Sequence, residues 1–334
     1  MIEPQQHLTP NLFSKEVIQE PIRVGFGRGL LEAGHRDKQI VALCADLTAS
    51  TKMDDFAKSY PERFVEVGIA EQNLVTVAAG MALAGKIPFV SSYAAFSPGR
   101  NWEQIRTTIC LNDVNVKIVG SHAGLMTGAD GATHQMLEDI ALMRVLPNMI
   151  VVVPADALEA EKATLILAAH RGPSYIRLAR EKSPVISTHK TPFSLNKAQV
   201  LRLGKDVTIV ACGTMVYQAL VAAEALAKKG IEAEVINAAV VKPLDTVTIT
   251  HSARKTGAVL TVEEGQIIGG LGGAVAETLA DHHPVPMTRL GMLDRFGESG
   301  TPQELLEYFG LTSKNITKQT LELLKRKPIQ GDHP

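Results

Sequence analysis

The sequence predicts an α/β protein with two consecutive α/β domains and mostly parallel sheets. Short apolar runs, such as IVALCA (40–45) and MIVVVP (149–154), alternate with longer amphipathic segments. Uninterrupted apolar strands between helices are typical of parallel sheets that are covered on both faces. Residues 181–197 interrupt this alternation and carry two prolines, and the alternation then restarts with DVTIVAC at 206–212. This break predicts a connection between two domains.

The first half is predicted to contain five helices and six strands. The helices are expected at 22–36, 72–85, 97–111, 136–146 and 155–170, and the strands at 40–45, 63–67, 87–93, 114–121, 149–154 and 173–179. Ser97 and Pro98 predict the start of the third helix, because serine caps helices and proline suits the first helical turn. Asp156 is expected to cap the last helix in the same way.

The second half repeats the pattern. Strands are expected at 206–212, 232–238, 257–264 and 285–290, with helices between them and two further helices near 302–309 and 315–326. We therefore predict a first domain over 1–182, a linker over 183–197 and a second domain over 198–330.

Composition excludes several classes of function. The 334 residues carry a net charge of −1 and only 4% aromatic residues, so neither nucleic acid nor an anionic membrane surface is an expected partner. The three cysteines are far apart and predict buried thiols in a reducing compartment, without a zinc site. The first residues lack the basic and apolar regions of a secretory signal, and the uncharged run 207–223 is too short for a membrane span. We expect a cytoplasmic protein.

In open α/β sheets, ligands bind beyond the carboxyl ends of the strands. The loops expected at those ends are 46–51, 68–71, 92–100, 120–135, 180–183 and, in the second domain, 263–272. The loop GSHAGLMTGADGATHQ (120–135) contains His122, Asp130 and His134 among four glycines. These side chains could converge on a polyhydroxylated substrate, or the histidines could simply cap helix ends; the sequence leaves both readings open. The spacing does not favour a metal site.

Other residues have ordinary structural explanations when taken alone. Glu71 precedes a predicted helix, where the helix dipole favours a carboxylate, and Arg23 and Arg180 could be surface charges. The glycine string GFGRG (25–29) is a weak nucleotide-binding signal, because no strand precedes it. The string GGLGGAV (269–275) indicates tight packing at a helix start, with room for an anion there.

Taken together, four segments resemble the transketolase family. They are GIAEQN, SSYAAFSPGR, SHAGLMTGADGATHQ and VEEGQIIGGLGGAVAE, in this order. The resemblance covers the family's pyrimidine-binding and C-terminal domains and nearly the whole chain. The family's first domain, which holds the diphosphate and Mg²⁺, is absent. The resemblance therefore implies the beta-type half of a split enzyme that assembles as α2β2, with thiamine diphosphate at the boundary between subunits and the Mg²⁺ ligands on the partner.

The resemblance also implies roles at the cofactor. Glu71 corresponds to the glutamate that hydrogen-bonds the aminopyrimidine ring, where an apolar setting would raise its proton affinity. Tyr93 and Phe96 match aromatic positions that pack on this ring, although Gly99 stands where relatives often carry a third aromatic residue. Asp46 matches a position near the thiazolium.

For the sugar, the resemblance implies that His134 exchanges protons with the substrate and that Asp130 binds a hydroxyl group. The positions that match the family's phosphate-binding residues are Arg23, Ser50, His122 and Arg180. Guanidinium groups suit phosphate because they offer a planar fork of donors. Many relatives carry Glu before the aspartate of this loop, whereas this chain has Ala129, which allows a shifted substrate preference.

The implied reaction is the reversible transfer of a two-carbon ketol unit from a ketose phosphate to an aldose phosphate. Xylulose 5-phosphate with ribose 5-phosphate or erythrose 4-phosphate is the default pair, and the isolated chain is expected to be inactive. The alternatives are a split transketolase for a sulfonated or branched sugar and the beta subunit of a 2-oxo-acid dehydrogenase. A 1-deoxyxylulose-5-phosphate synthase is disfavoured because that enzyme is normally one chain. An inactive binding or regulatory subunit is the non-enzymatic alternative.

Overall fold

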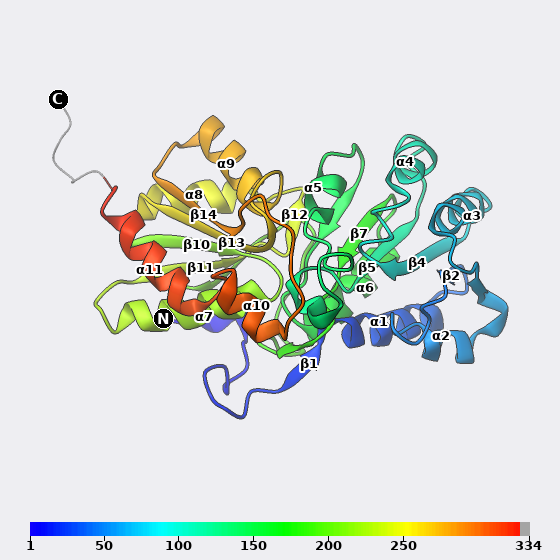
Figure 1. Ribbon diagram of the computed structural model, residues 1–334, viewed down its shortest axis with the longest axis horizontal. Helices are drawn as coiled ribbons and strands as arrows, with labels where there is room; N and C mark the ends of the chain where they lie inside the picture. Colours follow the sequence, from blue (N-terminus) through cyan, green and yellow to red (C-terminus); the bar gives the residue numbers. More distant parts are fainter. Residues whose placement is uncertain (328–334) are drawn as a thin grey trace.

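The computed structural model describes residues 1–327 and contains two β-sheets flanked by helices (Figure 1). A seven-stranded sheet has the order β12-β6-β7-β5-β4-β2-β3, and a five-stranded sheet has the order β14-β13-β10-β11-β9. All pairings within the two sheets are parallel except those of β12 and β9. The predicted α/β fold with two mostly parallel sheets is confirmed.

The first sheet has helices on both faces. Its parallel strands are β2 (Ile40–Cys44), β3 (Phe64–Glu66), β4 (Ile87–Tyr93), β5 (Lys117–Ser121), β6 (Ile150–Val152) and β7 (Ser174–Arg177). On one face, α1 (Ile22–Arg36), α2 (Asp54–Ser59) and α6 (Ala157–Ala169) share a core, and in Figure 1 α1 and α2 lie below the sheet. On the other face lie α3 (Glu71–Leu83), α4 (Trp102–Gln104) with a π-helical continuation Ile105–Cys110, and α5 (Asp139–Arg144).

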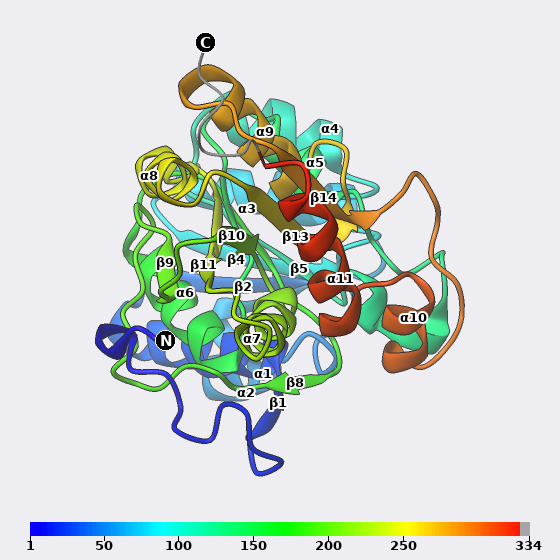
Figure 2. The same ribbon diagram turned by 90° about the vertical axis from the view of Figure 1, so that its left-hand side faces the viewer.

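The second sheet is covered in the same way, as the turned view shows (Figure 2). Its strands are β9 (Gln199–Arg202), β10 (Val207–Ala211), β11 (Ala233–Asn237), β13 (Val259–Gln266) and β14 (Met287–Met292). The helices α7 (Met215–Ala227) and α11 (Ser313–Leu324) pack on one face, and α8 (Thr246–Thr256) and α9 (Leu271–His282) on the other. The short α10 (Pro302–Tyr308) lies against the loop that follows β5. Because one apolar cluster contains residues of α3, α5, α8 and α9, the core continues from one sheet to the other.

The two halves of the chain are interleaved. The strand β12 (Val240–Lys242) follows β11 of the second sheet but pairs with β6 of the first. The N-terminal residues run along the second sheet, where Glu3 donates its backbone N–H to Leu201. They return to the first domain through β1 (Gln19–Pro21), which pairs with β8 (Lys182–Pro184). The predicted linker 183–197 thus begins within β8, and residues 328–330 of the predicted second domain lie outside the described residues.

One predicted helix start is wrong. The helix expected from Ser97 begins at Trp102, and residues 97–101 form turns. The Asn101 amide donates to Ser97 Oγ at 3.1 Å and to the carbonyl of Glu71 at 2.8 Å. Ser97 therefore serves as an acceptor inside this turn and does not cap a helix. The predicted cap at Asp156 is confirmed, since its side chain accepts the backbone N–H of Glu159 at 2.8 Å.

The two glycine strings serve packing. In α1, a Cβ on Gly25 would overlap the carbonyl of Ala157, so this glycine allows α1 to lie directly on α6. At the start of α9, the buried carboxylate of Glu263 accepts the backbone N–H groups of Leu271 and Gly272 at 2.8 and 2.7 Å. The anion that a helix start favours is thus supplied by the chain itself.

Candidate active site

The carboxyl ends of β2, β3, β4, β5 and β7 lie along one edge of the first sheet, and most of the predicted site residues follow them. Glu71 is the first residue of α3, and its side chain is only 5% exposed. Its two carboxylate oxygens accept hydrogen bonds from Arg100 Nη1 at 3.1 and 3.2 Å. A buried carboxylate at a helix start thus faces the segment that follows β4.

Four aromatic or imidazole rings gather beside this carboxylate. Tyr93 ends β4 and is aligned with Ser121 at the end of β5, so the next residue, His122, stacks on Tyr93 with 3.8 Å between ring centroids. Phe96 stacks on Tyr93 at 5.9 Å, and His134 meets the Phe96 ring edge to face at 5.3 Å. The Arg100 guanidinium covers Phe96 at 4.1 Å, which connects this ring group to Glu71.

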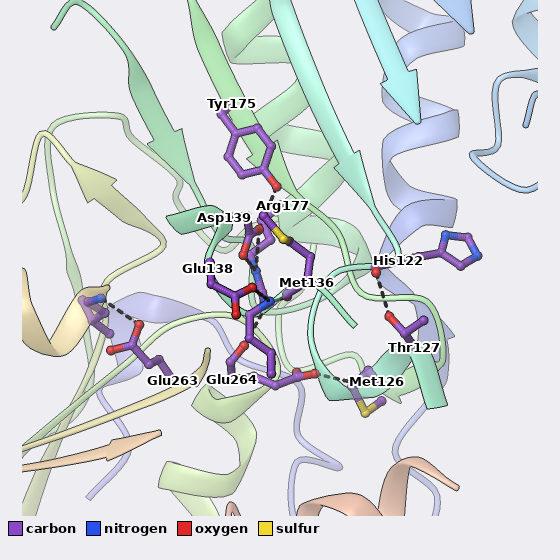
Figure 3. Close-up of polar contacts among 12 residues, drawn as sticks. His122, Met126, Thr127, Met136, Glu138, Asp139, Tyr175, Arg177, Glu263 and Glu264 are labelled. Carbon is purple, nitrogen blue, oxygen red and sulfur yellow. Dashed lines mark hydrogen bonds and ion pairs between the residues drawn. The ribbon is translucent and has the colours of Figure 1, made fainter. Parts of the chain in front are cut away.

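His122 is held in one orientation and stays neutral. Its backbone is in the left-handed region (φ 55°), its carbonyl accepts the Thr127 hydroxyl at 2.6 Å, and its Nδ1 lies 2.9 Å from Ser121 Oγ. Figure 3 shows the Thr127 contact. Burial, followed by the charges of Arg23 and Arg180, lowers the pKa of His122 to about 3. Since Nδ1 is engaged with Ser121, Nε2 is the nitrogen left to meet a ligand.

Two arginines flank His122. Arg23 comes from α1 and donates to the carbonyls of Ser50 and Arg180 at 2.6 and 3.1 Å. Arg180 follows β7 and donates from Nη1 to the carbonyl of Thr127 at 2.8 Å and to Asp130 Oδ2 at 3.2 Å. Burial lowers the pKa of Arg23, and the nearby positive charge of Arg180 lowers it further. Such a pair attracts an anion.

Ser50 and Asp46, the remaining predicted residues, lie in the loop that follows β2. Ser50 contributes its carbonyl to Arg23, and its hydroxyl has no part in that bond. Asp46 lies four residues earlier in the same loop, with φ 58° and its backbone N–H donated to Glu66 at 2.6 Å. The predicted residues thus form one connected group, except Asp46, which the structure links to Glu66.

Arg100 and Glu264 were not predicted from the sequence. Arg100 lies in the segment that was expected to be the first turn of a helix, and no pattern in the sequence pairs it with Glu71. Glu264 lies in β13 of the second domain and contacts the loop after β5. Its position in VEEG, at the end of an apolar run, was the available signal.

Neither a metal-binding side-chain cluster nor a membrane-spanning helix is found in residues 1–327. No cluster of three or more His, Cys, Asp or Glu side chains in this range is arranged to hold a metal ion. No helix in the same range has the length and apolar character needed to cross a membrane. The three cysteines are buried and unbridged, as predicted.

Comparison with known proteins identifies both domains. The family model of the transketolase pyrimidine-binding domain matches residues 21–185, and that of the transketolase C-terminal domain matches residues 196–316.

Three relatives match almost end to end. A 6-deoxy-6-sulfo-D-fructose transketolase subunit of Clostridium sp. is 46% identical over 89% of this chain and 92% of its own length. A putative transketolase C-terminal section of Methanocaldococcus jannaschii is 43% identical over 93% of this chain and 98% of its own length. One of the subunits of an apulose-4-phosphate transketolase of Phocaeicola vulgatus is 40% identical over 91% of this chain and 97% of its own length.

A solved structure agrees with these relatives. It is described as a split-gene transketolase in an inactive beta4 tetramer, and it is 49% identical with a TM-score of 0.87. The match covers 92% of this chain and 99% of that one. The chain therefore belongs to the transketolase family, as a C-terminal, beta-type subunit of the split form that consists of the pyrimidine-binding and C-terminal domains.

Proposed function

We propose that this chain is the subunit of a thiamine-diphosphate-dependent transketolase that holds the cofactor's pyrimidine ring and the sugar substrates. The observation that best supports this proposal is the buried Glu71 carboxylate beside the stacked Phe96 and Tyr93 rings. The pair Arg23 and Arg180 lies next to this group. A carboxylate and a flat aromatic surface fit an aminopyrimidine ring, which needs one hydrogen-bonding partner and a stacking surface.

When bound, thiamine diphosphate supplies the nucleophilic carbon for the transfer of a two-carbon ketol unit. Glu71 would hydrogen-bond the pyrimidine nitrogen and share a proton with it. Phe96 and Tyr93 would orient the ring, and Asp46 is proposed to contribute on the thiazolium side. His134, whose Nδ1 lies 2.9 Å from Thr133 Oγ1, moves protons at the sugar oxygens.

The substrates are a ketose phosphate and an aldose phosphate, with xylulose 5-phosphate and ribose 5-phosphate or erythrose 4-phosphate as the default pair. Arg23, Arg180 and the neutral His122 bind the terminal phosphate together with Ser50, because two forked cations and an N–H donor suit its three oxygens. Asp130 accepts a sugar hydroxyl. Its bond to Arg180 couples the two parts of the substrate site.

The diphosphate and Mg²⁺ ligands are assigned to an N-terminal partner subunit in an α2β2 assembly. The relatives support a partner, since those that match this chain over nearly their whole length are named as subunits or sections of transketolases.

A second candidate is a transketolase for a sulfonated or branched sugar. The relatives named for sulfofructose and apulose phosphate favour it, and a sulfonate offers an arginine pair the same three oxygens as a phosphate. Ala129 stands next to Asp130 where the family resemblance implies a glutamate, so a second carboxylate is missing at this position.

A coupled transketolase assay tests the proposal. Xylulose 5-phosphate and ribose 5-phosphate would be supplied with thiamine diphosphate and Mg²⁺, first to this chain alone and then with an N-terminal transketolase subunit from the same genome. Turnover in the mixture only, lost by about 10²–10⁴-fold in Glu71→Ala, is the expected result. Turnover of Glu71→Ala at the parent rate would exclude the mechanism. Turnover with 6-deoxy-6-sulfofructose as the donor, and none with xylulose 5-phosphate, would favour the second candidate.

A further inference from the structure

The loop that carries the predicted substrate residues closes at a narrow neck. The chain leaves β5 at Ser121 and returns at Met136, where Ala123 and Met136 form a parallel bridge and Gly124 donates its N–H to Met136 at 2.8 Å. Of the candidate residues, His122 precedes this neck, and Asp130 and His134 lie in the loop that it closes. Contacts that hold the neck therefore bear on the position of the whole loop.

Glu264, from β13 of the second domain, contacts this neck directly (Figure 3). Its side chain is buried, its Oε1 accepts the Met126 N–H at 2.6 Å, and its Oε2 accepts the Thr214 hydroxyl at 2.7 Å. The carboxylate lies so close to Gly124 that a Cβ there would overlap Oε1. Gly124 is also held at φ 80°, a conformation that glycine adopts readily.

A buried arginine completes the contact from the other side. Arg177 donates from Nη2 to the backbone carbonyl of Glu264 at 2.7 Å and to that of Met136 at 3.3 Å. Asp139 holds the same guanidinium through Nε at 2.9 Å and is itself bonded to the Tyr175 hydroxyl at 2.7 Å (Figure 3). The start of the loop is thus bonded to Glu264 through Met126, and its end is connected to Glu264 through Met136 and Arg177.

The end of the loop, next to the neck, touches the second domain again. The buried Gln135 amide donates to the carbonyl of Gly128 within the loop and to that of Glu298 outside it, both at 2.8 Å. The loop therefore rests on two segments of the second domain. A buried carboxylate that accepts a backbone N–H is the stronger of the two contacts, because charge-assisted hydrogen bonds are about twice as strong as neutral ones.

We propose that Glu264 is a positioning residue, through which the C-terminal domain fixes the backbone of Gly124–Met126 and so sets the places of His122, Asp130 and His134 at the sugar. The part that concerns the sugar rests on the proposed function. The structural part does not, since it concerns only the contact between Glu264 and the loop.

Backbone amide hydrogen exchange tests the structural part without any substrate. In Glu264→Ala, the exchange of the peptide that contains Gly124–Met126 should rise by about tenfold or more, because local opening there loses its acceptor. Glu264→Gln should remain close to the parent, since the amide oxygen can accept from Met126 while the amide N–H₂ donates to Thr214. Glu263→Ala is the matched control: the neighbouring buried carboxylate caps α9, so exchange should rise at Leu271–Gly272 and not in the loop.

Kinetics of the reconstituted complex test the functional part. Glu264→Ala should lower kcat/KM for the sugar phosphate by about tenfold to a hundredfold, the effect of a small misplacement of substrate contacts, with the cofactor requirement unchanged. Glu264→Gln should restore the parent value. If Glu264→Ala does not yield a folded chain, Thr214→Val removes one partner of the carboxylate and should give the same pattern with smaller changes.

Unchanged loop exchange in Glu264→Ala, or equal loosening by Glu263→Ala, would overturn the positioning role. If loop exchange rises in Glu264→Ala but the kinetic constants stay at the parent values, Glu264 only stabilises the loop. That result would also overturn the positioning role. If even the parent complex lacks turnover, the proposed function fails, while the exchange pattern still decides whether Glu264 holds the loop.

Discussion

Arg100 binds the buried carboxylate of Glu71 and at the same time covers the ring of Phe96. Its Nη1 lies 3.1 and 3.2 Å from the two carboxylate oxygens, and its guanidinium carbon lies 4.1 Å from the ring centroid. The arginine side chain is 51% exposed, whereas that of Glu71 is 5% exposed. The carboxylate proposed to meet the cofactor ring is thus engaged by a side chain that is half exposed.

The first prediction is that Arg100 competes with the cofactor. In the reconstituted complex, Arg100→Met should lower the thiamine diphosphate concentration needed for half-maximal activity by up to about fivefold, since an ion pair with an exposed partner is worth at most about 1 kcal/mol. Arg106→Met, which alters an exposed arginine in the following π-helical segment, should change nothing. A higher cofactor requirement in Arg100→Met would mean that Arg100 helps to bind the cofactor.

The second prediction concerns the sugar phosphate. Arg180→Ala should raise KM for phosphorylated sugars by about tenfold to a hundredfold, because charge-assisted hydrogen bonds contribute about 1.5–3 kcal/mol each. KM for the unphosphorylated donor hydroxypyruvate should change far less. Arg180→Lys keeps the charge without the forked donors and should give an intermediate value. Equal effects on both donors would remove Arg180 from the phosphate site.

The third prediction is a loss of stability in acid that depends on His122. Its pKa is about 3 in the folded chain and about 6.5 when unfolded, so between these values the unfolded state binds more protons. The contribution of His122 to the free energy of unfolding is therefore fully present above pH 6.5. It falls as the pH decreases, by about 2 kcal/mol at pH 5.

Urea unfolding at pH 7.5 and pH 5 checks this expectation. The loss of unfolding free energy between the two pH values should be about 2 kcal/mol smaller in His122→Gln than in the parent. Comparing the two pH values cancels any effect of the substitution that does not depend on pH. His189→Gln, at an exposed position, should leave the loss unchanged, and the same loss in His122→Gln would refute a buried neutral imidazole.

The fourth prediction concerns the cost of a side chain at Gly124. Gly85 and Gly124 have φ values of 86° and 80°, but Gly124 also has a ψ of −172°, a combination essentially confined to glycine. A Cβ on Gly85 meets no atom within 4 Å, whereas one on Gly124 would overlap Glu264. Gly85→Ala should cost about 1–2 kcal/mol of unfolding free energy in a urea titration. Gly124→Ala should cost about 1–3 kcal/mol more, because greater backbone strain and the overlap with Glu264 act together. Equal costs in the two variants would contradict this prediction.

The sequence was sufficient to predict the buried elements of the fold. The strands β2 and β6 are continuous apolar runs and β4 and β10 are largely apolar, while α1 and α6 lie in the longer segments between strands, so their positions follow from local patterns. The short strands β1, β8, β9 and β12 were not predicted. Each is three or four residues long, and each is defined by a partner strand far away in the chain, which a local pattern does not reveal.

The same distinction applies to the site. Glu71, Phe96 and His134 lie in distinctive motifs, and the structure brings the last two together with Tyr93 and His122. Arg100 was missed because its partner lies 29 residues away on another element. Glu264 was missed because it is 138 residues from Met126, in a different domain. Roles that depend on such contacts require the folded arrangement.

The crossing of β12 into the first sheet has a consequence for how the protein melts. Val240 pairs with Val152, and the Lys242 ammonium group donates to the carbonyls of Arg144 and Leu146. A fragment that ended in the linker would leave β6 as an open edge, which is a template for association with other chains. The two halves should therefore unfold in a single cooperative transition, and neither half should be obtained as a well-behaved monomer by cutting the chain between them.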